Sequence, residues 1–179
     1  GASHFDGHQF QNLSMEDGLL DTQVLRVYAD DKGAIWFGSQ RGITEYSPAR
    51  ANRGQSAFTY WTMKDGLPSG PVIAIVPDPA GGLWLGTTNG IVRRPPGVAA
   101  PGGARLTPAA TTNWNALVGM TVVSDGVLWA ATADQSLWRR DGSDLRRYSP
   151  VPQPANFEPL QCDPVVSALD GSLWFAAGP

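Results

Sequence analysis

A tryptophan motif recurs four times along this 179-residue chain at a nearly constant interval. In each copy, hydrophobic residues flank the tryptophan, and a glycine or alanine follows two positions later. The tryptophans, spaced 48, 45 and 45 residues apart, are Trp36, Trp84, Trp129 and Trp174. A second motif keeps the same register, because Asp17-Gly18-Leu19 recurs 48 residues later as Asp65-Gly66-Leu67. A period of 45 to 48 residues predicts an array of structural repeats stacked on one another.

Each repeat begins with the pattern of a β-hairpin. The first strands are rich in β-branched residues and are predicted at Val24–Tyr28, Val72–Val76, Gly119–Val123 and Val165–Leu169. The tight turns that follow are Asp31-Lys32-Gly33, Pro79-Ala80-Gly81, Asp125-Gly126 and Asp170-Gly171. An Asp-Gly pair between hydrophobic segments is a strong hairpin signal, because these residues tolerate the positive φ that such turns require.

The second strand of each repeat carries the tryptophan and is apolar on both faces. Alternation along a strand places Trp36 and Gly38 on one face, and Ile35 and Phe37 on the other. Two apolar faces indicate a sheet that lies between two neighbouring sheets. The small residues two positions after each tryptophan leave room for the neighbour to approach, and they are Gly38, Gly86, Ala131 and Ala176.

Two further strands complete each repeat. Third strands are predicted at Gly42–Tyr46, Gly90–Arg94 and Ser136–Arg140. Fourth strands are predicted at Phe10–Leu13, Phe58–Thr62 and Leu145–Tyr148, with residues 97–113 filling this place in the second repeat. Four antiparallel strands per period, without helical periodicity between them, predict an all-β fold, a β-propeller of about four four-stranded blades.

The expected organisation is a single propeller domain or fragment over residues 1–179. Its repeats run roughly over 17–62, 65–113, 117–156 and 160–179, with 1–13 completing the last blade, because Gly1–Phe5 aligns with Gly42–Tyr46. Three arrangements satisfy this alignment. The chain closes on itself as a four-bladed ring, forms half of an eight-bladed homodimer, or is a fragment of a larger propeller.

The linked motifs resemble the two-component-regulator propeller repeat. Asp17–Tyr46 and Asp65–Arg94 fit the whole pattern, whereas Gly119–Arg140 and Val165–Ala176 fit its tryptophan half. Residues 97–118 and 157–164 depart from it, because both lack the Asp-Gly-Leu motif. The resemblance implies the periplasmic or extracytoplasmic sensor region of a bacterial hybrid histidine kinase or related signalling protein, within a parent that carries a membrane span and an output domain.

Composition and motifs exclude several classes of function. The net charge is −3 and the arginine pairs are scattered, which argues against nucleic acid as a partner. The single cysteine, Cys162, excludes an intrachain disulfide, and no apolar stretch in the chain is long enough to span a membrane. Neither a catalytic motif nor a phosphate-binding loop is present, so we expect no cofactor and no enzymatic activity. The two histidines, His4 and His8, are candidates for metal ligands or for partners of a nucleophilic Cys162. We favour the structural alternatives, in which the histidines lie in a strand and a turn and Cys162 is a small buried thiol.

The recurring aspartates and tryptophans suggest calcium or sugar binding, but a structural role in each repeat explains their recurrence better. Aspartates recur in the first turn of each repeat and are Asp30, Asp31, Asp78, Asp125 and Asp170. Their side chains are expected to cap backbone N–H groups, although a ring of carboxylates also suits calcium. The repeated tryptophans are expected in the core, and Trp61 and Trp138 in packing between or outside blades. Trp114, between two asparagines in an irregular segment, suits either a sugar or a loop anchor.

Binding is expected on the rim where the turns between second and third strands meet the linkers between repeats, because loops vary on a rigid scaffold. The candidate ligand-binding residues of this rim are Gln40, Arg41, Asn89, Asp134, Gln135, Asp21, Gln23, Trp114 and Gln161. The sequence therefore predicts a non-catalytic sensor propeller that recognises a small molecule or an oligosaccharide. The alternatives are a propeller lyase or hydrolase that acts on polysaccharide, and a pure dimerisation module.

Overall fold

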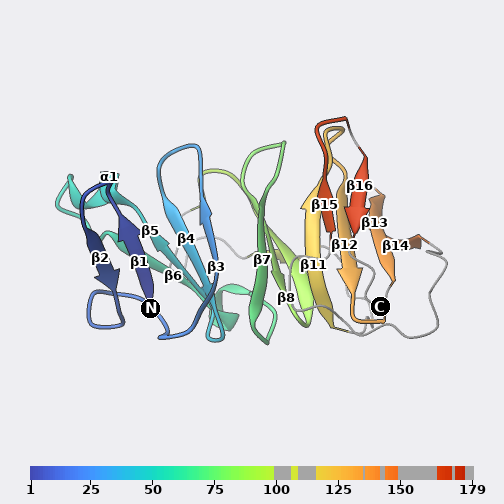
Figure 1. The fold of residues 1–179 in the computed structure, drawn as a ribbon. Helices are drawn as coiled ribbons and strands as arrows, with labels where there is room; N and C mark the ends of the chain where they lie inside the picture. The colour runs from blue at the N-terminus through green and yellow to red at the C-terminus, as the bar shows by residue number, and fades with distance from the viewer. Residues whose placement is uncertain are drawn as a thin grey trace.

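The structure is a computed structural model that describes residues 1–98, 106–108, 116–134, 136–141, 144–148, 165–170 and 172–175. Its sheets stand side by side along an open arc (Figure 1). The first complete sheet contains β3 (Val24–Ala29), β4 (Ile35–Ser39), β5 (Ile43–Tyr46) and β6 (Phe58–Trp61). The second contains β7 (Val72–Pro77), β8 (Leu83–Thr87), β9 (Gly90–Arg94) and β10 (Thr107–Pro108). The third contains β11 (Leu117–Val122), β12 (Leu128–Thr132), β13 (Leu137–Asp141) and β14 (Asp144–Tyr148).

Two-stranded sheets lie at the two ends of the arc. One is formed by β1 (Ala2–Phe5) and β2 (Phe10–Leu13), the other by β15 (Val165–Ser167) and β16 (Leu173–Phe175). Every strand pairs antiparallel with its neighbour in the chain, as a meander requires. The first strands β3, β7, β11 and β15 contact one another in succession. This radial arrangement of successive meanders is the propeller architecture predicted from the repeat.

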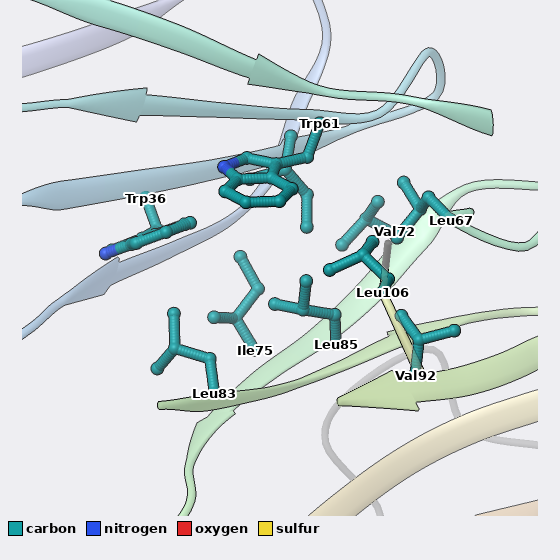
Figure 2. Close-up of a cluster of buried hydrophobic side chains, with 10 residues drawn as sticks. Trp36, Trp61, Leu67, Val72, Ile75, Leu83, Leu85, Val92 and Leu106 are labelled. Atoms are coloured by element: carbon teal, nitrogen blue, oxygen red, sulfur yellow. The ribbon is translucent and has the colours of Figure 1, made fainter. Parts of the chain in front are cut away.

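The core lies between neighbouring sheets. Trp36 is fully buried and Trp84 is 2% exposed. Figure 2 shows Trp36 and Trp61 of the first sheet facing Leu83 and Leu85 of the second. Each large side chain buried in this way contributes about 1.5–3 kcal/mol relative to an exposed one. The predicted core role of these two repeated tryptophans, and the packing role of Trp61, are therefore confirmed.

The glycines two positions after Trp36 and Trp84 leave room for the next sheet to approach, as expected. A Cβ atom added to Gly38 would lie 2.7 Å from Cγ1 of Val72, which belongs to the next sheet. A Cβ atom added to Gly86 would lie 2.7 Å from Cδ2 of Leu117, again in the next sheet. Sheets approach so closely at these positions that no side chain fits without a shift.

Four of the five aspartates predicted for the repeated turns accept hydrogen bonds from backbone N–H groups, and Asp31 accepts none from the described residues. Oδ1 of Asp30 accepts hydrogen bonds from the backbone N–H groups of Lys32 and Ala34, at 3.0 and 2.8 Å. The same bond to the residue two positions later is formed by Asp78, Asp125 and Asp170. No group of three or more potential metal ligands is found among the described residues.

Trp174 departs from the prediction that all four repeated tryptophans are core residues. Its side chain is 67% exposed, because β15–β16 is a two-stranded sheet at the end of the arc with a described neighbouring sheet on one side alone. Trp129, in the third sheet, is half-buried. The tryptophan position is thus buried only where a following blade covers it.

Three structural features were not anticipated. A one-residue register shift interrupts the first strand of each complete sheet near its start, at Val24/Arg26, Val72/Ala74 and Leu117/Gly119. A short helix, α1 (Pro48–Ala51), lies in the β5–β6 connection, and a 3-10 turn, η1 (Met63–Asp65), precedes β7. No helix among the described residues is long and apolar enough to cross a membrane.

Candidate functional site

The predicted rim lies at the ends of β4, β8 and β12, where the turns to the third strands meet the linkers between blades. In the first blade, Nε2 of Gln40 donates to Oε1 of Gln23 at 3.3 Å, so the turn is joined to the linker. In the second blade, Nδ2 of Asn89 donates in the same way to Oγ of Ser69 at 3.1 Å. The structure therefore brings turn and linker residues together within each blade.

The other described rim residues are also engaged locally. Oδ1 of Asp21 accepts from the backbone N–H of Gln23 at 3.2 Å. Asp134 accepts from Ser136 and from the Thr132 hydroxyl, and forms a 4.0 Å ion pair with Arg147. Partial burial raises the pKa of Asp134, but the hydrogen bonds and the nearby arginine outweigh it and hold the pKa below its ordinary value.

Of the remaining predicted rim residues, the structure describes Arg41 alone. Arg41 lies exposed in the β4–β5 turn, where its backbone N–H donates to Oγ of Ser39 at 3.2 Å. Trp114, Gln135 and Gln161 lie outside the described residues. The rim thus consists of short hydrogen bonds between turn and linker residues on the propeller scaffold. Its exposed side chains stay predicted ligand contacts.

A cleft of about 930 Å³ lies at the opposite rim of the propeller. The β3–β4 turn, the β5–β6 connection and the segment after β9 line it, and antiparallel strands bring these connections to the end away from the β4–β5 turn. Its cationic lining residues are Lys32, Arg50, Arg53 and Arg94, and its anionic ones are Asp30 and Glu45.

Arg94 forms the half-buried wall of this cleft. Its guanidinium lies 4.7 Å from the ring centroid of Trp36 and 5.2 Å from that of Trp61, and its Nη2 donates to the carbonyl of Val98 at 2.7 Å. Its Nε is buried and has no hydrogen-bond partner among the described residues. Burial lowers the pKa of Arg94, opposed by the charges of Glu45 and Asp30. This cation is therefore only partly compensated.

The two carboxylates beside Arg94 already accept hydrogen bonds from the core indoles. Oδ2 of Asp30 accepts from Nε1 of Trp36 at 3.1 Å, and Oε2 of Glu45 accepts from Nε1 of Trp61 at 3.3 Å. The other cations of the cleft are more accessible to a ligand. Lys32 and Arg53 are exposed, and Arg50 donates to Oγ1 of Thr59. An excess of cations in a cleft of this size suits a ligand that carries carboxylate or sulfate groups.

The sequence interpretation missed this cleft, because it forms between two repeats. Arg94 closes the third strand of the second repeat, whereas Arg50 and Arg53 belong to the long β5–β6 connection of the first. One signal was available. Residues 47–57 lengthen this connection in the first repeat and contain both arginines.

A smaller hollow lies along the inner strands. It has a volume of about 200 Å³, and its lining combines Arg26 with mainly apolar side chains of β3, β7, β11 and β15, including Val27, Met120 and Val166. The hollow offers few polar groups to orient a ligand, so the cleft at the blade edge is the stronger candidate site.

Residues 66–89, which run from the linker through β8, match the family model of the two component regulator propeller. This segment is a two component regulator propeller repeat. The other tryptophan-bearing segments of the chain share its strand order and spacing. None of the curated protein sequences is significantly similar to the chain.

Solved structures share the arrangement of these propeller repeats. The extracellular domain of BT4673, a hybrid two component system from B. thetaiotaomicron, is 14% identical with a TM-score of 0.70 over 96% of this chain. The extracellular domain of BT3049, from the same organism, is 18% identical with a TM-score of 0.68 over 94% of this chain. The chain spans 22% and 23% of those two structures.

A propeller enzyme is similar to the same degree. Virginiamycin B lyase from Staphylococcus aureus is 20% identical with a TM-score of 0.68 over 97% of this chain, which spans 55% of the lyase. At these identities the likeness establishes the propeller fold of the chain, and function has to be argued from the residues.

Proposed function

We propose that the chain is part of the extracytoplasmic sensor propeller of a bacterial two-component receptor and binds a ligand without transforming it. The observation that carries the proposal is the propeller repeat at residues 66–89, which occurs in a fold shared with extracellular domains of two such systems. Binding would favour one arrangement of the parent's output domain, so the signal is a population shift.

The proposed ligand is an oligosaccharide that carries acidic groups. The cations of the cleft supply charge-assisted hydrogen bonds to carboxylates or sulfates, and the amide side chains of the opposite rim suit hydroxyl groups. We assign the acidic groups to the cleft. The rim residues, with Gln40 and Asn89 as examples, are proposed as a second contact surface for the same class of ligand.

A lyase acting on polysaccharide is the second candidate. The likeness to virginiamycin B lyase over 97% of the chain favours it. This function would require a general acid and base beside one cavity. The cleft presents instead arginines and a lysine beside two carboxylates that accept hydrogen bonds from indoles, so binding is the better-supported function.

Calorimetric titration of the chain with acidic and neutral oligosaccharides tests the proposal. Oligogalacturonate and sulfated oligosaccharides are expected to bind saturably and unchanged, and neutral cello- and manno-oligosaccharides at least about tenfold more weakly, because each charge-assisted hydrogen bond contributes about 1.5–3 kcal/mol. Arg53→Gln is expected to weaken binding of the acidic ligand by about tenfold or more.

The matched control changes an exposed arginine that belongs neither to the cleft nor to the rim. Arg146→Gln, on β14, should leave the affinity for the acidic ligand unchanged. Equal loss in the Arg53→Gln and Arg146→Gln variants would show that the net charge of the chain, and not the cleft, determines binding. Release of unsaturated or shortened products during titration would support the lyase, and absence of heat with every ligand would contradict the sensor proposal.

A further inference from the structure

The cleft lies between the first and the second complete blades, so both of its walls belong to described parts of this chain. Its six charged side chains fall into two groups that differ in exposure. We call the half-buried group the inner end of the cleft and the exposed group its mouth. The inner end consists of Asp30, Glu45, Arg50 and Arg94, and the mouth of Lys32 and Arg53.

The inner end is built on the two buried indoles of the first blade, which Figure 2 shows. The Arg94 guanidinium lies 4.7 Å from the ring centroid of Trp36 and 5.2 Å from that of Trp61. The indole N–H of Trp36 donates to Asp30, and that of Trp61 donates to Glu45. One cation and two carboxylates therefore contact the same pair of rings.

Arg50 brings a second cation to this end. It donates to the hydroxyl of Thr59, and Thr59 is paired with Glu45 across β5 and β6. Directly opposed residues of antiparallel strands have Cβ atoms about 4.5–5.5 Å apart, so the two side chains are neighbours. Two arginines and two carboxylates thus balance at the inner end. The cleft has four cations and two carboxylates, and the excess of two positive charges belongs to Lys32 and Arg53 at the mouth.

The charges of the inner end are not consumed by one another. No salt bridge joins them among the described residues. In the same part of the chain, Nε of Arg94 has no hydrogen-bond partner and Oε1 of Glu45 accepts no hydrogen bond. Donors and acceptors are therefore both left for a ligand.

The next interface between blades shows the opposite arrangement. Arg140 stacks on Trp84 there, as Arg94 stacks on the preceding blade. The position of Glu45 is occupied by Arg93, however, because Arg93 is the residue that pairs with Trp84 across β8 and β9. Arg93 forms an ion pair with the buried carboxylate of Asp78. Unpaired charges of both signs thus distinguish the first interface from the second.

A balanced set of cations and carboxylates suits hydroxyl groups better than an acidic group. A hydroxyl donates to a carboxylate and accepts from a guanidinium, and neighbouring hydroxyls of one sugar ring do both. An acidic group at the inner end would lie beside Asp30 and Glu45, and like charges in close contact weaken binding. The mouth holds cations alone among the described lining residues, so an acidic group binds there without this repulsion.

We propose that the cleft binds a mixed oligosaccharide, with a neutral sugar residue at the inner end and the adjoining uronic acid residue at the mouth. This assignment rests on the proposed function, because it takes the cleft as the site of an acidic oligosaccharide. Glu45 is the specificity-determining residue, since its charge disfavours a second acidic group, and Arg53 binds the uronic acid carboxylate.

Calorimetric titration with three disaccharides of similar size tests this order of charges. A disaccharide of galactose and galacturonic acid, in the better of its two linkage orders, should bind about tenfold or more tightly than digalacturonate, whose second carboxylate has to enter the inner end. It should exceed digalactose by about tenfold or more, because digalactose leaves the cations of the mouth without an acidic partner.

Glu45→Gln tests the residue that sets the preference. The variant keeps an oxygen that accepts from Nε1 of Trp61 and loses the charge, so the preference for the mixed disaccharide over digalacturonate should fall to about onefold. A loss of stability does not imitate this result, because the ratio compares two ligands on the same folded protein. Glu16→Gln, which removes the same charge from an exposed position outside the cleft, should keep the original ratio.

The outcomes separate this inference from the proposed function. Equal affinities of the unaltered chain for digalacturonate and the mixed disaccharide would overturn the inference and leave the proposed function standing. An unchanged ratio in Glu45→Gln, or an equal change in Glu16→Gln, would do the same. Failure of every acidic ligand to bind would contradict both.

Discussion

Single residues of the repeat act through the contact that each makes with the next blade. Trp36 and Trp84 fill the space between sheets, and the glycine two positions later lets the neighbouring strand approach. The two glycines differ in what they face. Gly38 faces Cγ1 of Val72, which is stiff at χ1, whereas Gly86 faces Cδ2 of Leu117 and the sulfur of Met120, the far ends of flexible side chains.

A graded response to alanine follows from this difference. Gly38→Ala should lower the free energy of unfolding by about 1–3 kcal/mol, because Val72 has no alternative position without a backbone shift. Gly86→Ala should cost less, since the Leu117 and Met120 side chains rotate away. Urea denaturation of both variants beside the unaltered chain gives the comparison. Equal and negligible losses would show that the sheets are not in close contact at these glycines.

At the scale of strands and turns, the repeat made most of the fold predictable. The second strands β4, β8 and β12 carry Trp36, Trp84 and Trp129 as expected, because turn residues and alternating apolar residues mark them locally. The register shifts at the start of the first strands were not predictable, since no residue type marks them. α1 escaped detection because four residues are too few to show helical periodicity.

An arginine that stacks on the tryptophan of the preceding blade is a further contact between strands of different sheets. Arg140 is half-buried with its guanidinium 4.7 Å from the Trp84 ring, whereas Arg139 is exposed and lies 5.9 Å from the ring of Trp129 in its own sheet. Arg140→Ala should lower the free energy of unfolding by about 1–2 kcal/mol through lost stacking and lost packing of the arginine stem. Arg139→Ala, the matched control, should cost less than about 0.5 kcal/mol in the same denaturation experiment. A reversed order would contradict the inter-blade role.

At the scale of the whole molecule, the sequence predicted the architecture better than the site. The period and the strand order specify a radial array of blades. The cleft, however, depends on Arg94 of one blade lying beside Arg50 of another, and the period of the sequence does not predict which side chains line the space between blades. For the same reason the exposure of Trp174 was not foreseen, because the motif is identical whether or not a neighbouring blade covers it. Of the predicted rim, Gln40 and Gln23 are brought together as turn-to-linker contacts.

A crystal structure of the purified chain tests the central claim, that the tryptophan repeats are successive blades around one axis. The account predicts β3, β7, β11 and β15 as adjacent innermost strands, with Trp36 and Trp84 buried between sheets. A single continuous sheet through these strands, or both indoles on a solvent-facing surface, would contradict it.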